Sequence, residues 1–110
     1  MKLSSEEIRM IAEYFRNKSA LRAFLFGSFS RGEAEENSDV DILVELDYSK
    51  HIGLGFVGMK LDLENRLHKK IDLVSSEAIS KYISPFIEND KKLIYILQYT
   101  FVFDTNFRIF

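Results

Sequence analysis

The sequence contains no cysteine, so disulfide bonds and thiolate metal sites are excluded. It also lacks a basic excess, because 15 Lys and Arg stand against 17 Asp and Glu and the formal net charge is -2. A surface that binds nucleic acid usually shows as clustered Lys and Arg with a high pI. We therefore expect no direct nucleic-acid binding.

Long apolar runs are absent as well, and none approaches the length needed to span a bilayer. The first residues, Met1 to Glu7, are polar and acidic where a signal peptide would be apolar. We therefore expect no membrane partner and a cytoplasmic location. Low-complexity tracts are also missing, and 46% of the residues are hydrophobic, which predicts a globular chain with one core.

The apolar pattern predicts helices that alternate with strands. Ser4 or Ser5, followed by Glu6-Glu7, is typical of a helix N-cap, and this helix should end at 16–19. The further elements that we expect are a strand over 20–26, a short helix from Ser28 to about Glu33, a strand over 39–46, a helix from 56 to about 68, a strand over 70–74, a helix capped by Ser75 or Ser76, and a last helix that begins at Pro85 and runs to about Leu97. This order is typical of a small α/β layer structure.

The chain divides into residues 1–98 and an aromatic tail over 99–110. The tail carries four phenylalanines, at positions 101, 103, 107 and 110. An exposed apolar cluster usually contacts something, so the tail could be an interface strand or an anchor. An additional core strand and a disordered tail are the alternatives, and the sequence does not separate them.

A glycine follows the strand over 20–26 directly, and Gly27-Ser28 then opens the short helix. Glycine lets the backbone approach a ligand closely and adopt conformations that other residues avoid. The first N–H groups of a helix favour an anionic phosphate, and the Ser28 hydroxyl adds a donor there. A strand followed by Gly-Ser is also common in ordinary turns, so this motif needs support from its surroundings.

Two aspartates open the strand over 39–46. Because side chains alternate along a strand, Asp39 and Asp41 point to the same face, opposite to Val40 and Ile42. Two carboxylates so placed repel each other unless a cation or a proton lies between them. Mg²⁺ prefers carboxylate oxygens together with substrate phosphates, so the pair suits metal–nucleotide chemistry.

A third carboxylate, Asp72, lies within the apolar run Ile71 to Val74. If this strand lies beside the strand over 39–46, Asp72 can join Asp39 and Asp41. Three carboxylates could hold two metal ions for an in-line displacement at phosphorus. The alternative is that Asp72 lies at an exposed strand edge.

With Gly27-Ser28, Arg31-Gly32 and Ser38-Asp39-Val40-Asp41 in place, the chain resembles the minimal nucleotidyltransferases of the DNA polymerase beta-like superfamily. The resemblance covers residues 5 to 97. It implies a small mixed sheet with helices mainly on one face and ATP as the donor. It further implies that Gly27 and Ser28 grip the triphosphate, and that the metal ligands and catalytic residues, which hold two Mg²⁺ ions, are Asp39, Asp41 and Asp72.

Many bacterial and archaeal members of this family resemble the antitoxin partner of a HEPN-type ribonuclease toxin. The resemblance therefore implies transfer of AMP to a tyrosine of such a toxin. Larger nucleotidyltransferases carry a further domain for the acceptor, and this chain has no room for one, so we expect a partner protein to present it. The alternatives are an antitoxin that masks its toxin stoichiometrically with a vestigial nucleotide site, and adenylylation of a small hydroxylated molecule such as an aminoglycoside, for which a homodimer could complete the site.

Two residues near the motif keep alternatives open. Arg31 lies three residues after Ser28, so it could reach a phosphate, or it could pair with a carboxylate such as Glu33 as a structural tie. His51 lies in the loop over 47–55 and could carry a proton, although a lone loop histidine is more often simply solvated.

Overall fold

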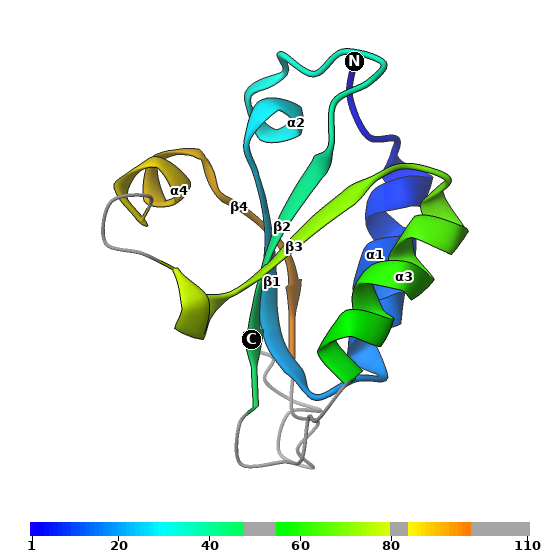
Figure 1. The fold of residues 1–110 in the computed structure, drawn as a ribbon, viewed down its shortest axis with the longest axis vertical. Helices are drawn as coiled ribbons and strands as arrows, with labels where there is room; N and C mark the ends of the chain where they lie inside the picture. The colour runs from blue at the N-terminus through cyan, green and yellow to red at the C-terminus, as the bar shows by residue number, and fades with distance from the viewer. Residues whose placement is uncertain (48–54, 80–83, 98–110) are drawn as a thin grey trace, which may run out of the picture.

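A computed structural model describes residues 1–47, 55–79 and 84–97 of the chain. Within these ranges the elements follow the order α1, β1, α2, β2, α3, β3, a 3-10 turn, α4 and β4 (Figure 1). None of the helices described is long and apolar enough to cross a membrane. The loop that contains His51 and the aromatic tail lie outside the described residues.

The first helix, α1, runs over Ser5–Arg16 and shows how the sequence sets a helix end. The Ser4 hydroxyl accepts the Glu7 N–H at 3.0 Å, and the Glu7 carboxylate accepts the Ser4 N–H at 2.9 Å. This capping box satisfies two N–H groups that the helix itself leaves unpaired. The predicted N-cap is confirmed, with Ser4 as the capping residue.

Four strands form one mixed sheet in the order β3-β2-β1-β4. The strands are β1 (Ala20–Phe26), β2 (Val40–Leu46), β3 (Ile71–Ser75) and β4 (Lys92–Ile96). β1 pairs antiparallel with both β2 and β4, whereas β2 pairs in parallel with β3. The parallel pair needs a crossover, and α3 (Gly55–Leu67) provides it.

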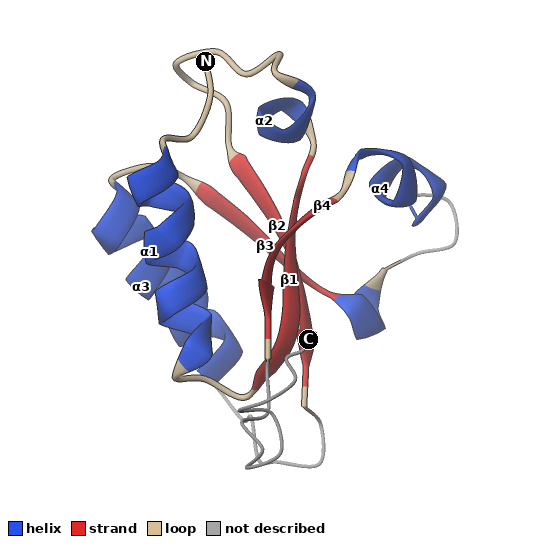
Figure 2. Ribbon diagram, turned by 180° about the vertical axis from the view of Figure 1, so that it is seen from behind, coloured by secondary structure: helices blue, strands red, loops and turns tan. Residues whose placement is uncertain are grey.

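Helices cover the two faces of the sheet unequally. α1 and α3 lie together on one face, and α4 (Ser84–Asp90) and the 3-10 turn (Ser76–Ala78) lie on the other (Figures 1 and 2). The larger core joins α1 and α3 to the sheet and includes Phe15, Ile42 and Leu63. A smaller cluster of Phe24, Leu43 and Ile87 fixes α4 on the opposite face. The predicted fold class is confirmed.

The end of the described chain differs from the prediction. The helix that begins near Pro85 ends at Asp90, and Lys92–Ile96 forms strand β4 in place of the expected helix to Leu97. β1 is buried along most of its length and needs a hydrogen-bonding neighbour on each side, and β4 provides the second one. The helix expected after Ser75 is likewise only a 3-10 turn, capped by the Ser75 hydroxyl.

Candidate active site

The turn between β1 and α2 (Ser28–Arg31) depends on Gly27. Its backbone has φ 73° and ψ -155°, a conformation that is almost restricted to glycine. The Gly27 carbonyl accepts the N–H groups of Ser30 and Arg31, each at 3.0 Å. The short helix therefore begins directly at the glycine, as predicted, and ends at Gly32 in a left-handed conformation.

The Gly27 backbone also packs directly against the Asp41 side chain. A Cβ atom at position 27 would lie 2.1 Å from Asp41 Oδ2 and 3.0 Å from its Cγ. No side chain fits into that space. The predicted phosphate turn and the predicted metal ligand are thus in contact, although 13 residues lie between them in the sequence.

The three predicted aspartates lie at the adjoining ends of β2 and β3. In the parallel register Asp41 lies opposite Asp72, while Asp39 immediately precedes β2. Asp41 is half-buried, and the other two side chains are exposed. The predicted adjacency of β3 and β2 is confirmed, which puts Asp72 beside Asp41, and Asp72 also occupies the exposed edge-strand position that was the alternative.

The environment of Asp41 disfavours its charge. Burial, followed by the charges of Asp72 and Asp39 and a hydrogen bond with Asp72, raises the pKa of Asp41 to about 6. The guanidinium of Arg31 acts in the opposite direction and is the weaker influence. A cation bound among these carboxylates would relieve the repulsion between them.

The donor set suits a hard divalent cation such as Mg²⁺, which takes carboxylate and phosphate oxygens. Among the residues that the structure describes, no three acidic or histidine side chains are arranged as a ready metal cluster. Asp41 and Asp72 nevertheless lie side by side, and Asp39 acts on Asp41 through its charge. The residues therefore fit Mg²⁺ in their chemistry and in their unbalanced negative charge.

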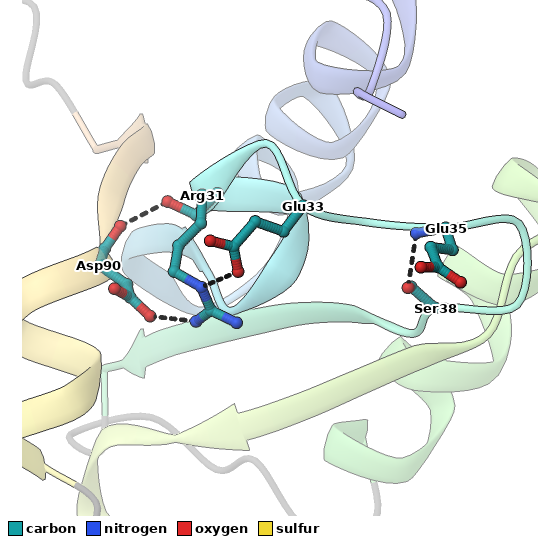
Figure 3. A network of polar contacts seen from close by, with 6 residues as sticks. Arg31, Glu33, Glu35, Ser38 and Asp90 are labelled. Carbon is teal, nitrogen blue, oxygen red and sulfur yellow. Dashed lines mark hydrogen bonds and ion pairs between the residues drawn. The ribbon is translucent and has the colours of Figure 1, made fainter.

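Arg31 is held as a structural tie. Its Nε donates to Glu33 Oε1 at 2.9 Å, and its Nη1 donates to Asp90 Oδ2 at 2.6 Å (Figure 3). The Ser30 hydroxyl donates to the Asp90 backbone carbonyl, so α2 is fastened to the end of α4 at two points. Of the two roles that the sequence left open, the structure supports the pairing with carboxylates. Asp90 is a partner that the sequence did not indicate.

The loop before Asp39 is closed by two hydrogen bonds between Glu35 and Ser38. The Ser38 hydroxyl accepts the Glu35 N–H at 2.8 Å (Figure 3), and the Ser38 N–H donates to the Glu35 carbonyl at 3.0 Å. This turn leads the chain into β2, and Asp39, the residue just before the strand, is exposed. In the motif Ser38-Asp39-Val40-Asp41, the serine thus serves the shape of the loop.

The comparisons with known proteins agree with this geometry. The family model described as polymerase beta, nucleotidyltransferase, matches residues 9–99. The protein adenylyltransferase MntA of Thermococcus cleftensis is 36% identical over an alignment of 87 residues, which covers 74% of this chain and 87% of that relative.

Two solved structures share the fold. A toxin–antitoxin chain crystallised with AMP-PNP has a TM-score of 0.68 and 24% identity, over 87% of this chain and 76% of the other. The second comes from a complex of a tri-AMPylated HEPN toxin of Shewanella oneidensis with its MNT antitoxin. It has a TM-score of 0.66 and 20% identity, over 87% of this chain and 75% of that one. At these identities the likeness is one of fold.

Proposed function

We propose that this chain, which belongs to the polymerase beta nucleotidyltransferase family, transfers AMP from ATP to a hydroxyl group of a partner protein. The observation that carries the proposal is the contact between the Gly27 turn and the Asp41 carboxylate, with Asp72 beside it. A phosphate-binding turn and metal-binding carboxylates in contact are what transfer at phosphorus requires. The relative's name supplies the kind of acceptor.

In this reaction Gly27 and Ser28 hold the triphosphate of ATP through the N–H groups at the start of α2 and the serine hydroxyl. Asp39, Asp41 and Asp72 would hold two Mg²⁺ ions, which would neutralise the charge that develops on the phosphate oxygens. Asp72 is exposed and would give the proton of the acceptor hydroxyl a route to solvent. That oxygen bonds to the α-phosphorus while the bond to the β-phosphate oxygen breaks, and pyrophosphate leaves.

The partner is a HEPN-type toxin, and the acceptor is a tyrosine hydroxyl of that toxin. The neighbouring fold comes from a complex in which such a toxin carries three AMP groups, and it supports both the partner and more than one transfer. We place the reaction in the cytoplasm. Masking of the toxin without catalysis is the competing function, and it makes a different prediction for the aspartates.

The test uses the chain with ATP, Mg²⁺ and the product of the neighbouring gene, followed by intact-mass measurement of that product. We expect mass additions of AMP, and a loss of about 100-fold or more in Asp41→Asn, because the isosteric amide removes only the charge. Glu36→Gln, on the exposed loop, removes the same charge elsewhere and should retain activity. Neutralisation of the toxin by Asp41→Asn without AMP transfer would establish masking in place of catalysis.

A further inference from the structure

We propose that the outer stripe of α3 docks an amphipathic helix of the partner protein, one whose apolar side is bordered by acidic residues. The outer stripe consists of Val57, Gly58, Leu61 and Asn65. This inference rests on the proposed function for the existence of a partner, and it adds the surface that holds that partner. The apolar side chains of the stripe, its glycine and the charges beside it each support the docking of a helix.

α3 is apolar on two opposite sides. Met59, Leu63 and Leu67 are buried in the main core. Because an α-helix turns about 100° per residue, positions two residues away point to roughly the opposite side. On that side Val57 and Leu61 are 57% and 53% exposed, and the outer stripe contains no charged residue. A surface helix normally carries polar and charged side chains there, so exposed apolar side chains indicate a contact with another protein.

α1 provides an internal comparison, because it lies beside α3 on the same face of the sheet (Figures 1 and 2). Its exposed side carries four charged residues in two ion pairs, Glu6 with Arg9 and Glu13 with Arg16. Pairs of residues three apart on a helix are typical of a solvated surface. The apolar character of the outer stripe is therefore a property of the α3 sequence, since its neighbour in the same layer has a charged exterior.

Gly58 lies in the interior of α3, where glycine is less favourable than alanine. A Cβ atom there would meet nothing within 4 Å, so the packing of this chain does not require a glycine. Glycine allows another molecule to approach the backbone closely. A partner helix that crosses α3 at Gly58 comes nearer than a side chain would permit, and it meets Val57 and Leu61, which lie one turn apart.

Cations border the outer stripe on both flanks. Lys60 lies on the flank toward the start of β3. Arg66 lies on the flank toward α1, with its guanidinium 5.0 Å from the centre of the Tyr14 ring, and the Lys18 ammonium lies 4.9 Å from the same ring. All three cations are exposed, and none forms an ion pair with a residue in the described part of the chain.

The carboxylates in the same region are already engaged. Asp62 accepts the Tyr14 hydroxyl at 2.7 Å, and Glu64 accepts the Ile71 N–H at 3.0 Å. The borders of the outer stripe therefore attract acidic side chains of a partner. A second copy of this chain would bring the same cations against one another across a two-fold interface, so the charges favour a different protein over a homodimer.

The docking surface leaves the candidate active site open. Asp41 lies opposite Phe26 in the sheet and points to the same face, where Phe26 packs on the cluster that holds α4. α3 lies on the other face, and it packs against the edge strand β3, which carries Asp72. A partner seated on α3 therefore reaches Asp72 around the edge of the sheet.

The test measures the Kd between the chain and the product of the neighbouring gene by calorimetric titration without ATP, so that no transfer takes place. We expect Leu61→Glu to weaken binding about 10-fold or more, because the introduced carboxylate would lose its hydration in an apolar contact. Leu93→Glu is the matched control, since Leu93 is 51% exposed and lies on β4, at the opposite edge of the sheet from β3. It should bind as the wild type does.

Gly58→Met separates docking from folding. Methionine is a better helix former than glycine, and it has open space at this position, so Tm should rise by about 4 °C. Its side chain occupies the place of the partner helix and should weaken binding about 10-fold. A variant that is more stable and yet binds more weakly cannot owe its loss to misfolding. In AMP transfer, Leu61→Glu and Gly58→Met should both raise the KM for the partner while kcat falls less than about 2-fold.

Unchanged affinity in either Leu61→Glu or Gly58→Met, or an equal loss in Leu93→Glu, would overturn the docking surface and leave the proposed function standing. A change in the sedimentation of the chain alone, with partner affinity intact, would also overturn it, because a second copy would then be the occupant. Weaker binding by both variants, together with a wild type that binds the partner and transfers no AMP, would support the docking surface and overturn the proposed function.

Discussion

Replacing Gly27 with alanine tests whether the proposed phosphate turn positions the proposed catalytic carboxylate, Asp41. The added Cβ would lie 2.1 Å from Asp41 Oδ2, whereas ordinary contact begins near 3.4 Å. The carboxylate oxygen therefore has to retreat by roughly 1.3 Å, or the turn has to move away from it. Either shift separates the two halves of the site.

The magnitudes follow from two separate effects. Alanine at φ 73° and ψ -155° costs about 1–3 kcal/mol, because this region is almost restricted to glycine. A displacement of about 1 Å in a catalytic group can lower a rate about 100-fold. We expect Gly27→Ala to lose at least that much AMP transfer, and to lose stability as well.

Gly32 provides the matched control on the same short helix. Its φ is 75°, and a Cβ there would meet nothing within 4 Å. Gly32→Ala should therefore cost about 1–2 kcal/mol from backbone strain alone, and lower Tm by about 4–8 °C. AMP transfer, measured well below the Tm of both variants, should stay within a few-fold of wild type in Gly32→Ala. Equal activity of the two variants would refute the idea that Gly27 sets the position of Asp41.

Three further predictions concern stability. In a chelator, Asp41→Asn should be about 1–3 kcal/mol more stable than wild type at pH 7, because burial and the neighbouring carboxylates raise the pKa of Asp41 to about 6 and each pKa unit is worth about 1.4 kcal/mol. The stability that the Asp41 carboxyl contributes to the wild type is complete below about pH 4 and is lost as the pH rises through 6. Parallel Tm–pH profiles of wild type and Asp41→Asn would contradict the prediction. Arg31→Ala and Asp90→Ala should each lower the free energy of unfolding, and a denaturant double-mutant cycle should give a coupling of about 0.5–1 kcal/mol, whereas additive losses would show that the ion pair contributes nothing. Tyr95→Phe should stabilise the chain by about 1 kcal/mol, because the buried Tyr95 hydroxyl has no hydrogen-bond partner among the described residues. Tyr14→Phe should destabilise the chain by about 1–2 kcal/mol, because it removes the hydrogen bond from the Tyr14 hydroxyl to Asp62. A change of the same sign in both variants would refute this assignment of the two hydroxyl groups.

The local motif could be predicted from the sequence because its signals are local. Gly27-Ser28 follows an apolar strand directly, and Asp39 and Asp41 share a strand face by alternation alone. The contact between Gly27 and Asp41 could not be predicted in this way. It depends on the antiparallel register of β1 and β2, in which Phe26 lies opposite Asp41.

The prediction failed where long-range pairing decides the structure. The segment from Lys92 to Ile96 continues a plausible helix, yet it becomes a strand because β1 requires a second neighbour. The run Leu-Ile-Tyr-Ile, rich in β-branched and aromatic residues, was the available signal. Because the helix was expected to continue to Leu97, the sequence did not show that Asp90 ends α4 and accepts hydrogen bonds from Ser30 and Arg31.

The end of α3 controls the position of the third carboxylate, Asp72. β3 can lie parallel to β2 only through the crossover, and α3 is fixed in place by Met59, Leu63 and Leu67 in the main core. His68 then ends the helix, and three residues later β3 begins, so the packing of α3 sets where Asp72 meets Asp41. A core defect in α3 should therefore lower AMP transfer as well as stability, because it displaces Asp72 from Asp41.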